Sequence, residues 1–563
     1  MPFAPSSTSA RSKAPVRGSV RGGGPLVRTS LLLLLIALVV SAAVRVRVAS
    51  TPLERDEGEY AYAGQLIREG IPPYRLTYNM KFPGPYYAYA AIMSAGGETP
   101  EAIRHGLLLV VAGTTVLIFL LAQRLFGDAP AATSAAAFAL LALDRGVLGI
   151  FAHATHFVVL FSTAGLLLLF GGGSSPTRVR LTGAGACFGL AIAMKQHAVA
   201  FLLPGWILCL FPPSTLAPSP RRDGSVRCLW LGLGAALPLV LMVAVLAAGG
   251  VLDRFWFWTV DYAWHYVTAL PAAEAVPRFA TALAWVTRDS RPIWLGGALG
   301  LAALPFLRGH REARYLLPAL AVASLLSLSA GFYFREHYFI LALPIVALGV
   351  GAVTRAVSLL LQRSLGEVAA AGVALGLVTS LLAGWVVGQR DFLFRMTPRA
   401  ISRSCYGANP FVEAPAIARQ IAATSPQQAR IAVFGSEPEI FFLAQRRSAS
   451  GYIYVYPLME PQPYASTMQR EMIQEVEASQ PEYVVFVQVP WSWLPRPGSD
   501  QTVLRWGQRF VDSCYELIGV TDVFSDAESA ILWDDAARAY QPRSANLVLT
   551  YRRRVSGPCL IAP

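Results

Sequence analysis

Lysine is rare in this chain, and the positions that carry it could do specific chemistry. Of the 47 basic residues only three are lysines, Lys13, Lys81 and Lys195. A chain that otherwise uses arginine but keeps Lys81 and Lys195 indicates sites that prefer a compact ammonium group to a planar guanidinium group. Phosphate is a natural ligand for such a point charge. We therefore interpret Lys81 and Lys195 as candidate phosphate-binding residues.

Two acidic residues, Asp56 and Glu57, precede Lys81 in a segment with helix-capping signals. Asp56 stands at an N-cap position with Glu59 three residues later, which predicts a short helix at the membrane surface. A capping role for Asp56 and a favourable interaction of Glu57 with the helix dipole could explain both carboxylates without chemistry. The segment around Lys81, with its Pro-Gly-Pro turn and four tyrosines, favours a functional site instead.

Two further polar clusters interrupt apolar segments. Lys195 and Gln196 lie at the end of one apolar segment, and Arg335, His337 and Tyr338 lie between two others. Ionisable groups within membrane segments are functional candidates. Anchoring of these side chains at the membrane interface is the alternative. The aromatic loop at 251–292 has the same two interpretations, an interfacial belt or a wall of a substrate site.

These residues need a scaffold, and the composition indicates a membrane protein. The chain has 563 residues, of which 54% are hydrophobic and 14% charged, whereas soluble proteins are about half apolar and about a quarter charged. Its apolar blocks are roughly 17 to 25 residues long, enough for helices that cross a bilayer. We predict about eleven spans, near residues 29–49, 105–126, 130–145, 147–170, 181–195, 197–212, 229–249, 293–307, 315–332, 338–354 and 366–388.

Arginine placement predicts the orientation. Residues 1–28 are rich in arginine and poor in apolar residues, which indicates a disordered cytoplasmic tail. The loop at 50–104 is then outside, and so is everything after an eleventh span. Cleavage of the first apolar block as a signal peptide is the alternative, and it leaves the loop outside as well. The net charge of +13 comes with no nucleic-acid-binding motif, so we expect no nucleic acid partner.

The tail, residues 389–563, has the composition of a soluble α/β domain. Ile431–Phe434 and Tyr483–Val489 read as buried strands, and Glu413–Ala423 and Tyr464–Ala478 have helical spacing. On the predicted outer side this domain could contact the loop at 50–104. An oxidising location would permit one disulfide among the cysteines of the tail, although the sequence does not reveal which of them pair: Cys405, Cys514 and Cys559.

The residues together resemble the GT-C superfamily of membrane glycosyltransferases, in particular the protein O-mannosyltransferases and lipid A aminoarabinose transferases. The resemblance covers most of the chain and rests on the order and spacing of short pieces relative to the spans. They are Asp56-Glu57 with Tyr60, Lys81-Phe-Pro-Gly84, Lys195-Gln196, His337-Tyr338-Phe339 with Pro344, and Phe434-Gly-Ser-Glu-Pro438. It implies a polytopic α-helical membrane protein of GT-C type, with a transmembrane domain at 29–388 and a soluble α/β domain at 389–563 on the outer face.

The resemblance also implies an activity. It is the transfer of a hexose or pentose, with inversion, from a polyprenyl-phosphate donor to a lipid, glycan or protein acceptor of the cell envelope. The site would face the periplasm or exterior from a bacterial inner (cytoplasmic) membrane. Asp56 would be the general base and Glu57 a positioning acid, Lys81 the first candidate for the donor phosphate, and Lys195 or Arg335 the second. Further substrate-binding candidates are Tyr60, His156, Gln196, His337 and Tyr338.

One departure from the pattern concerns a second acid. Relatives often carry one near the outer start of the fourth span, where this chain has His153-Ala-Thr-His156. His156 could hydrogen-bond a sugar or bind a metal ion as a neutral imidazole, or simply pack against its neighbours. We therefore predict no bound metal and no cofactor, although a divalent ion is conceivable.

Two other functions fit the same sequence. A transporter or flippase of lipid-linked glycans would also need buried cations but would not need Asp56. A non-catalytic scaffold of GT-C type, with the α/β tail as its interaction module, is the third interpretation. Asp56 and Lys81 are both present, which favours an enzyme.

Overall fold

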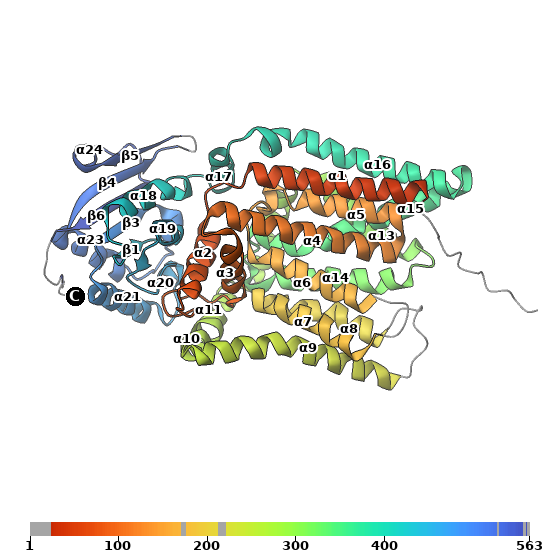
Figure 1. Cartoon of the computed structure of the whole chain (residues 1–563), viewed down its shortest axis with the longest axis horizontal. Coiled ribbons are helices and arrows are strands. Elements are labelled where there is room, and N and C mark those ends of the chain that lie inside the picture. Colours follow the sequence, from red (N-terminus) through yellow and green to blue (C-terminus); the bar gives the residue numbers. More distant parts are fainter. Residues whose placement is uncertain (1–23, 171–175, 212–220, 526–527, 555–558, 560–563) are drawn as a thin grey trace, which may run out of the picture.

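The computed structural model has two parts and describes residues 24–170, 176–211, 221–525, 528–554 and 559. Long helices run side by side along the long axis, and an α/β domain lies at one end of them (Figure 1). Two short helices of the loop at 50–104, α2 (Arg55–Arg68) and α3 (Gly84–Gly96), lie between the two parts.

Eleven long helices form the membrane part within the described residues, and each overlaps one predicted span. They are α1 (Pro25–Arg47), α4 (Pro100–Phe126), α5 (Asp128–Leu141), α6 (Ala154–Phe170), α7 (Arg178–Met194), α8 (Leu202–Leu210), α9 (Arg221–Ala248), α13 (Arg291–Ala303), α14 (Arg311–Leu328), α15 (Leu343–Leu365) and α16 (Glu367–Gly388). Among the described residues, five helical stretches are both long and apolar enough to cross a bilayer. The number of eleven spans therefore stays a prediction.

The amino-terminal boundary of the first helix differs from the predicted one. Most of the predicted disordered tail, residues 1–23, lies outside the described residues. Helix α1 begins at Pro25, four residues before the predicted span. Proline is well suited to the first turn of a helix because its φ is already helical and its missing N–H has no partner there.

Two breaks in helices of the bundle place polar side chains at the end next to the α/β domain (Figure 1). Helix α6 begins only at Ala154, because residues 142–153 form turns in which Leu148 has φ 56°. Helix α7 ends at Met194, and Lys195 is extended before the 3₁₀ helix η2 (Gln196–Phe201). Both breaks lie where one predicted span ends and the next begins, and the first is longer than predicted; they leave His153 and Lys195 outside regular α-helix.

The capping prediction for α2 is wrong by two residues. The N-cap is Glu54, whose side chain accepts a hydrogen bond from the Glu57 amide, while the Glu57 side chain accepts one from the Glu54 amide. Asp56 lies in the first turn and caps nothing. The register is fixed by tertiary contacts, since Arg104 also binds the Glu57 carboxylate. The capping explanation for Asp56 therefore falls away.

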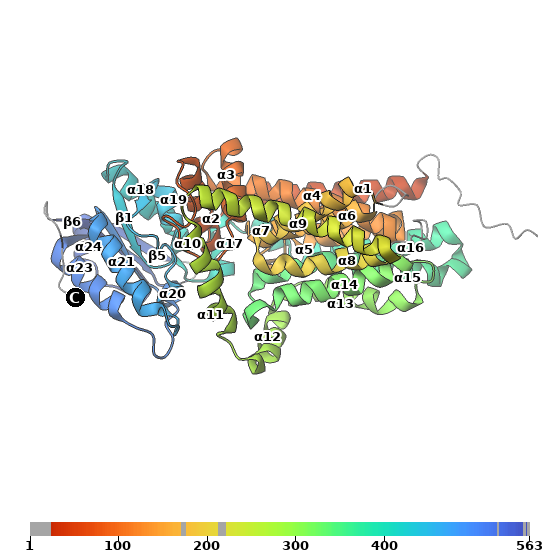
Figure 2. The ribbon, with the colours of Figure 1, turned by 90° about the horizontal axis from the view of Figure 1, so that it is seen from below.

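The aromatic loop forms an outer arm, residues 252–287. It consists of α10 (Leu252–Trp256), the π-helix η3 (Phe257–Tyr262), α11 (Ala263–Thr268), η4 (Ala272–Glu274) and α12 (Ala275–Thr287). Figure 2 shows α11 and α12 projecting away from the bundle. Trp258 and Tyr262 of the arm are buried, and Trp258 packs against Tyr78 and Tyr452.

The tail contains a mixed sheet of six strands among its described residues, in the order β2-β1-β3-β6-β4-β5. Strand β1 pairs in parallel with β2 and β3, and the remaining pairs are antiparallel. The strands are β1 (Arg430–Phe434), β2 (Arg447–Ser448), β3 (Tyr483–Gln488), β4 (Tyr515–Val523), β5 (Ser529–Trp533) and β6 (Leu547–Arg553). The two predicted strands are confirmed as β1 and β3.

Helices cover this sheet and connect it to the bundle. The two predicted helices are confirmed as α18 (Ala414–Thr424) and α21 (Ala465–Ser479). The helices are α17 (Pro398–Tyr406), α18 (Ala414–Thr424), α19 (Glu439–Ala444), α20 (Tyr456–Met459), α21 (Ala465–Ser479), α22 (Pro490–Trp493), α23 (Thr502–Cys514) and α24 (Asp534–Arg538). Cys514 and Cys559 form a disulfide, and Cys405 is a free thiol in the described chain.

The α/β domain and the loop at 50–104 are in contact, as the sequence analysis expected. Helix α19 packs on α2 so closely that a Cβ at Gly58 would lie 2.5 Å from the Glu439 amide nitrogen. Arg55 of α2 forms an ion pair with Glu437, 3.1 Å away, just before α19. The α/β domain therefore has a fixed position relative to the helix that carries Asp56.

Candidate active site

A cavity of about 720 Å³ lies where the bundle, the outer arm and the α/β domain meet. The bundle side contributes the ends of helices rather than their middles, because α6 and α7 both break there. The predicted site residues that line it are Asp56, Tyr60, Lys81, Lys195, Gln196, Arg335, His337 and Tyr338. Residues far apart in the sequence thus converge on one chamber.

Asp56 and Lys81 form an ion pair at the wall of the cavity. The Lys81 Nζ lies 2.7 Å from Asp56 Oδ1 and 2.6 Å from Glu59 Oε2. It also lies 4.8 Å from the centre of the Tyr60 ring. The Lys81 ammonium group is therefore already neutralised by two carboxylates, which leaves it less suited to a phosphate than the sequence analysis expected.

The ion pair keeps Asp56 ionised. Burial raises the pKa of Asp56, but the charge of Lys81, with smaller contributions from His337 and His153, lowers it well below its ordinary value. Burial likewise lowers the pKa of Lys81, and Asp56 and Glu59 more than reverse this. Asp56 is therefore an ionised carboxylate at any pH near neutrality.

Close backbone packing brings the Lys81 segment to the end of α7. A Cβ at Gly84 would lie 2.4 Å from the carbonyl oxygen of Ala193, so this approach requires glycine. The Gln196 side chain donates a hydrogen bond of 2.6 Å to the carbonyl of Met80. These contacts place Lys81 and Lys195 on the same chamber.

Three cations of the cavity lining differ from Lys81 in having no close carboxylate partner among the residues that the structure describes: Lys195, Arg335 and Arg496. The Lys195 Nζ lies 3.9 Å from the centre of the Tyr338 ring, and the Arg335 guanidinium carbon lies 5.8 Å from that of Tyr333. Which of the predicted cations binds the donor phosphate stays a prediction, but Lys195 and Arg335, unlike Lys81, have no carboxylate at ion-pair distance within the described chain.

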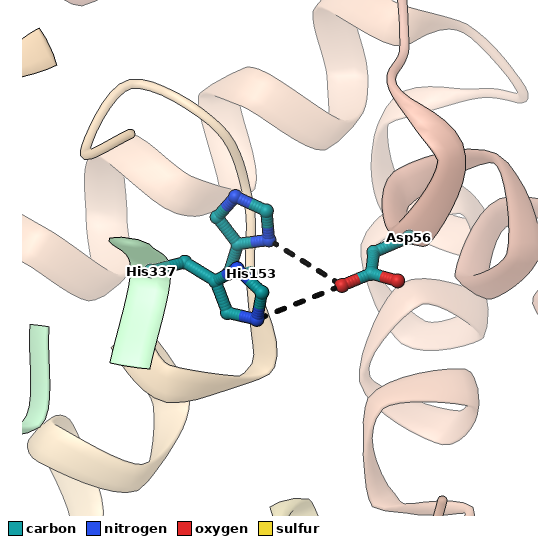
Figure 3. Close-up of side chains that lie close together, drawn as sticks. All are labelled: Asp56, His153 and His337. Atoms are coloured by element: carbon teal, nitrogen blue, oxygen red, sulfur yellow. Dashed lines mark ion pairs between the residues drawn. The ribbon is translucent and has the colours of Figure 1, made fainter. Parts of the chain in front are cut away.

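Two histidines face the other oxygen of Asp56 (Figure 3). His153 Nδ1 and His337 Nε2 each lie 3.8 Å from Asp56 Oδ2, and their rings stack with centroids 4.3 Å apart. His153 is only 1% exposed, and within the described chain neither of its ring nitrogens has a hydrogen-bond partner. A water molecule or an ion could serve as the partner of this buried imidazole, and Glu54 Oε1 lies 3.7 Å from its Nδ1.

These three side chains fit a divalent metal ion. One ligand atom from each lies within 4.8 Å of the others, and two imidazoles with one carboxylate suit Zn²⁺ or a similar transition metal. The sequence analysis predicted no metal because a second acid was missing. That reason no longer holds, since two histidines stand in its place.

Addition of Zn²⁺ is expected to raise the thermal unfolding midpoint of the purified protein, because an ion that binds only the folded state stabilises it. His337→Ala should abolish the increase, whereas His105→Ala, which replaces an exposed histidine outside the cavity, should retain it. Metal content by mass spectrometry provides a second measurement. If the midpoint is the same with and without Zn²⁺, the prediction that the protein binds no metal stands.

Two predicted site residues lie outside the cavity lining that the described residues form. The Glu57 carboxylate is fully buried, 2.6 Å from the Arg104 guanidinium and 2.6 Å from the Ala152 amide. His156 is buried in the first turn of α6. Neither position supports the predicted role. Glu57 is held by the protein itself, and His153 rather than His156 reaches Asp56.

The part of the cavity lining that the α/β domain contributes was not predicted from the sequence. The α/β domain contributes Tyr454, Tyr456, Glu460 and Arg496 to the lining, and no local motif marks them, since only the tertiary fold brings them to Asp56. The outer arm contributes Tyr262, Trp264 and Tyr266. This position favours the wall of a substrate site over an interfacial belt, although Trp264 is also 69% exposed.

Comparison with known proteins gives one family match and several structural matches. The family described as dolichyl-phosphate-mannose-protein mannosyltransferase matches residues 81–247. No curated protein sequence matches the chain. ArnT from Cupriavidus metallidurans bound to undecaprenyl phosphate is similar over 95% of this chain and 99% of its own, with 17% identity and a TM-score of 0.58.

The other similar structures extend the likeness. ArnT in the apo state matches over 93% of this chain and 98% of its own, with 17% identity and a TM-score of 0.56. The archaeal oligosaccharyltransferase AglB from Archaeoglobus fulgidus, in complex with an inhibitory peptide and a dolichol-phosphate, matches over 92% and 75%, with 14% identity and a TM-score of 0.50. The chain is thus a multi-pass membrane protein that has the fold of ArnT and AglB, and it resembles the protein mannosyltransferases over residues 81–247.

Proposed function

We propose that this protein transfers a sugar from a polyprenyl-phosphate donor to a hydroxyl group of a cell-envelope acceptor, with inversion at the anomeric carbon. One observation carries the proposal: an ionised carboxylate, Asp56, lines the same cavity as Lys195 and Arg335, two cations without a carboxylate at ion-pair distance in the described chain. A base and an anion site in one chamber are what such a transfer requires.

The proposed reaction is a direct displacement. The acceptor oxygen forms a bond to the anomeric carbon while the bond from that carbon to the phosphate oxygen breaks on the opposite face, which inverts the configuration. The acceptor proton passes to Asp56, and the polyprenyl phosphate leaves with its electron pair. Negative charge grows on the departing phosphate, where Lys195 and Arg335 stabilise it.

The other cavity residues support these steps. Lys81 holds Asp56 ionised, and Glu59 shares Lys81, so that the ammonium group stays in place. Tyr338 positions Lys195 through its ring, 3.9 Å away. A divalent ion bound by Asp56, His153 and His337 would supply a Lewis acid beside the reacting oxygens.

The nature of the donor is supported by the similar structures. ArnT was found with undecaprenyl phosphate and AglB with a dolichol-phosphate, and both share this fold. Eleven spans would place the cavity on the outer face of a bacterial cytoplasmic membrane. The transferred sugar would be a hexose or a pentose, and the acceptor an envelope lipid, glycan or protein.

Substitution of the two proposed phosphate ligands tests donor binding. Lys195→Ala and Arg335→Ala are each expected to weaken binding of undecaprenyl phosphate by roughly 10- to 100-fold, since each removes a charge-assisted contact. Binding is measured as the ligand-dependent rise of the thermal unfolding midpoint. Arg68→Ala, which removes a cation that pairs with Glu98 outside the cavity, should bind normally. Equal binding by all four proteins would refute the phosphate site.

Transport of a lipid-linked glycan remains the competing function, because it also uses buried cations. It requires no base. Cells that lack the gene should lose a glycosylated envelope lipid, glycan or protein, and the wild-type gene should restore it. Restoration by an Asp56→Asn variant would favour transport over transfer.

A further inference from the structure

The α/β domain builds one side of the cavity. Lys195 and Arg335 both come from the membrane part, whereas Tyr454, Glu460 and Arg496 come from the α/β domain. The domain thus adds its own hydrogen-bonding groups to the lining. A transfer reaction needs a second substrate, and these groups are candidates to bind it.

Tyr454 is the residue of the α/β domain that lies next to the Asp56–Lys81 pair. The centre of its ring lies 5.3 Å from the Lys81 Nζ, on the same ammonium group that pairs with Asp56. It lines the cavity, and its hydroxyl has no hydrogen-bond partner among the residues that the structure describes. A tyrosine hydroxyl both donates and accepts hydrogen bonds, so one on a cavity lining is free to bind a ligand there. A substrate hydroxyl is the partner that this position offers.

Ser436 fixes Tyr454 relative to Asp56. Its carbonyl oxygen accepts a hydrogen bond of 2.5 Å from the Arg55 guanidinium, and its hydroxyl accepts one of 3.0 Å from the Val455 amide. Arg55 directly precedes Asp56, and Val455 directly follows Tyr454. One buried serine therefore connects the neighbour of the base with the neighbour of the tyrosine across the domain boundary.

Further polar groups continue along this side of the cavity. Glu460 accepts a hydrogen bond from Tyr262 through one carboxylate oxygen, and Glu460 and Arg496 both belong to the same lining. A donor, an acceptor and a hydroxyl distributed along one surface match a ligand with several hydroxyl groups better than a single side-chain hydroxyl or a hydrocarbon tail.

We propose that Tyr454 contacts the acceptor and that the wall of Tyr454, Glu460 and Arg496 binds a sugar ring of that acceptor, one of whose hydroxyls Asp56 deprotonates. The proposal rests on the proposed function, since it assigns the second substrate of the same reaction. It makes the α/β domain half of the active site, with the donor bound by the membrane part and the acceptor by the domain.

The test compares two tyrosine-to-phenylalanine changes that lie two residues apart. Tyr454→Phe keeps the ring and removes the free hydroxyl, whereas Tyr452→Phe removes a hydroxyl that binds Glu471 in the domain interior. In cells that lack the endogenous gene, we expect Tyr454→Phe to lower the glycosylated product about tenfold at equal protein level. Tyr452→Phe should give wild-type product. Binding of undecaprenyl phosphate should be unchanged in both.

Each outcome separates the acceptor site from the proposed reaction. Wild-type product with Tyr454→Phe would refute the acceptor contact, and so would an equal loss of undecaprenyl phosphate binding, which would place Tyr454 at the donor. Mass spectrometry that finds the added sugar on a peptide side chain would refute the sugar-ring assignment. Wild-type product with Asp56→Asn would instead refute the transfer reaction itself, whatever Tyr454 does.

Discussion

Replacement of Asp56 by asparagine is expected to lower sugar transfer by a factor of about 10²–10⁴, the range that general bases contribute. An amide has the shape of the carboxylate but cannot accept the acceptor proton. Lys81 keeps Glu59 as its partner at 2.6 Å, so the substitution leaves no buried ammonium group unpaired. The measurement is the amount of glycosylated envelope product per amount of inserted protein.

The same variant provides its own controls. Its thermal unfolding midpoint and its binding of undecaprenyl phosphate should stay close to those of the wild type, because the loss concerns proton transfer alone. Acid should not inactivate the wild-type site through Asp56 until the pH falls below about 4, since Lys81 lowers the pKa of this carboxyl group. Transfer within a factor of two of the wild type would contradict the role as base.

The parts of the site that depend on local chemistry could be predicted from the sequence. Asp56, Lys81 and Lys195 stand out by residue type in an apolar, arginine-rich chain, and the structure places all three on the cavity. What each cation binds could not be predicted in this way. Lys81 meets two carboxylates only because α2 and the Gly84 turn fold back on each other, so the availability of Lys195 to an anion is a tertiary property.

The roles of His153 and His156 also could not be predicted from the sequence. His153 and His156 lie three residues apart, and nothing in the sequence distinguishes them. The turns at 142–153 decide the matter, because α6 starts at Ala154, which leaves His153 in front of the helix, facing Asp56, and His156 inside it. A helix that began at residue 147, as predicted, would have given both side chains ordinary positions within a span.

Predictions of the fold succeeded where the hydrophobic pattern is strong. The apolar runs at β1 and β3 are buried central strands, whereas β4, β5 and β6 alternate or carry charges and gave no comparable signal. The cap of α2 failed for another reason. Several acids at consecutive positions can each cap a helix, and contacts with Arg104 and Ala152 select Glu54 and Glu57.

These contacts give Glu57 a structural role, whereas the adjacent Asp56 lines the cavity. Its carboxylate accepts hydrogen bonds from the Glu54 amide, the Ala152 amide and the Arg104 guanidinium. Through them α2 is tied to the start of α4 and to the turn that carries His153. Asp56 can face the cavity because Glu57, on the next residue, anchors the helix to the bundle.

Glu57→Ala is therefore expected to destabilise the protein by about 3–5 kcal/mol, the usual cost of removing one partner of a buried ion pair. Arg104, 2% exposed, would keep a charge in the interior without its carboxylate, and the Ala152 amide would lose its acceptor. Unfolding in detergent, followed by denaturant or heat, measures the loss against the neighbouring Asp56→Asn as control. A change below about 1 kcal/mol, the size of a surface effect, would show that Glu57 does not anchor α2. If the Glu57→Ala protein is stable but inactive, Glu57 instead takes part in the reaction, as the sequence predicts.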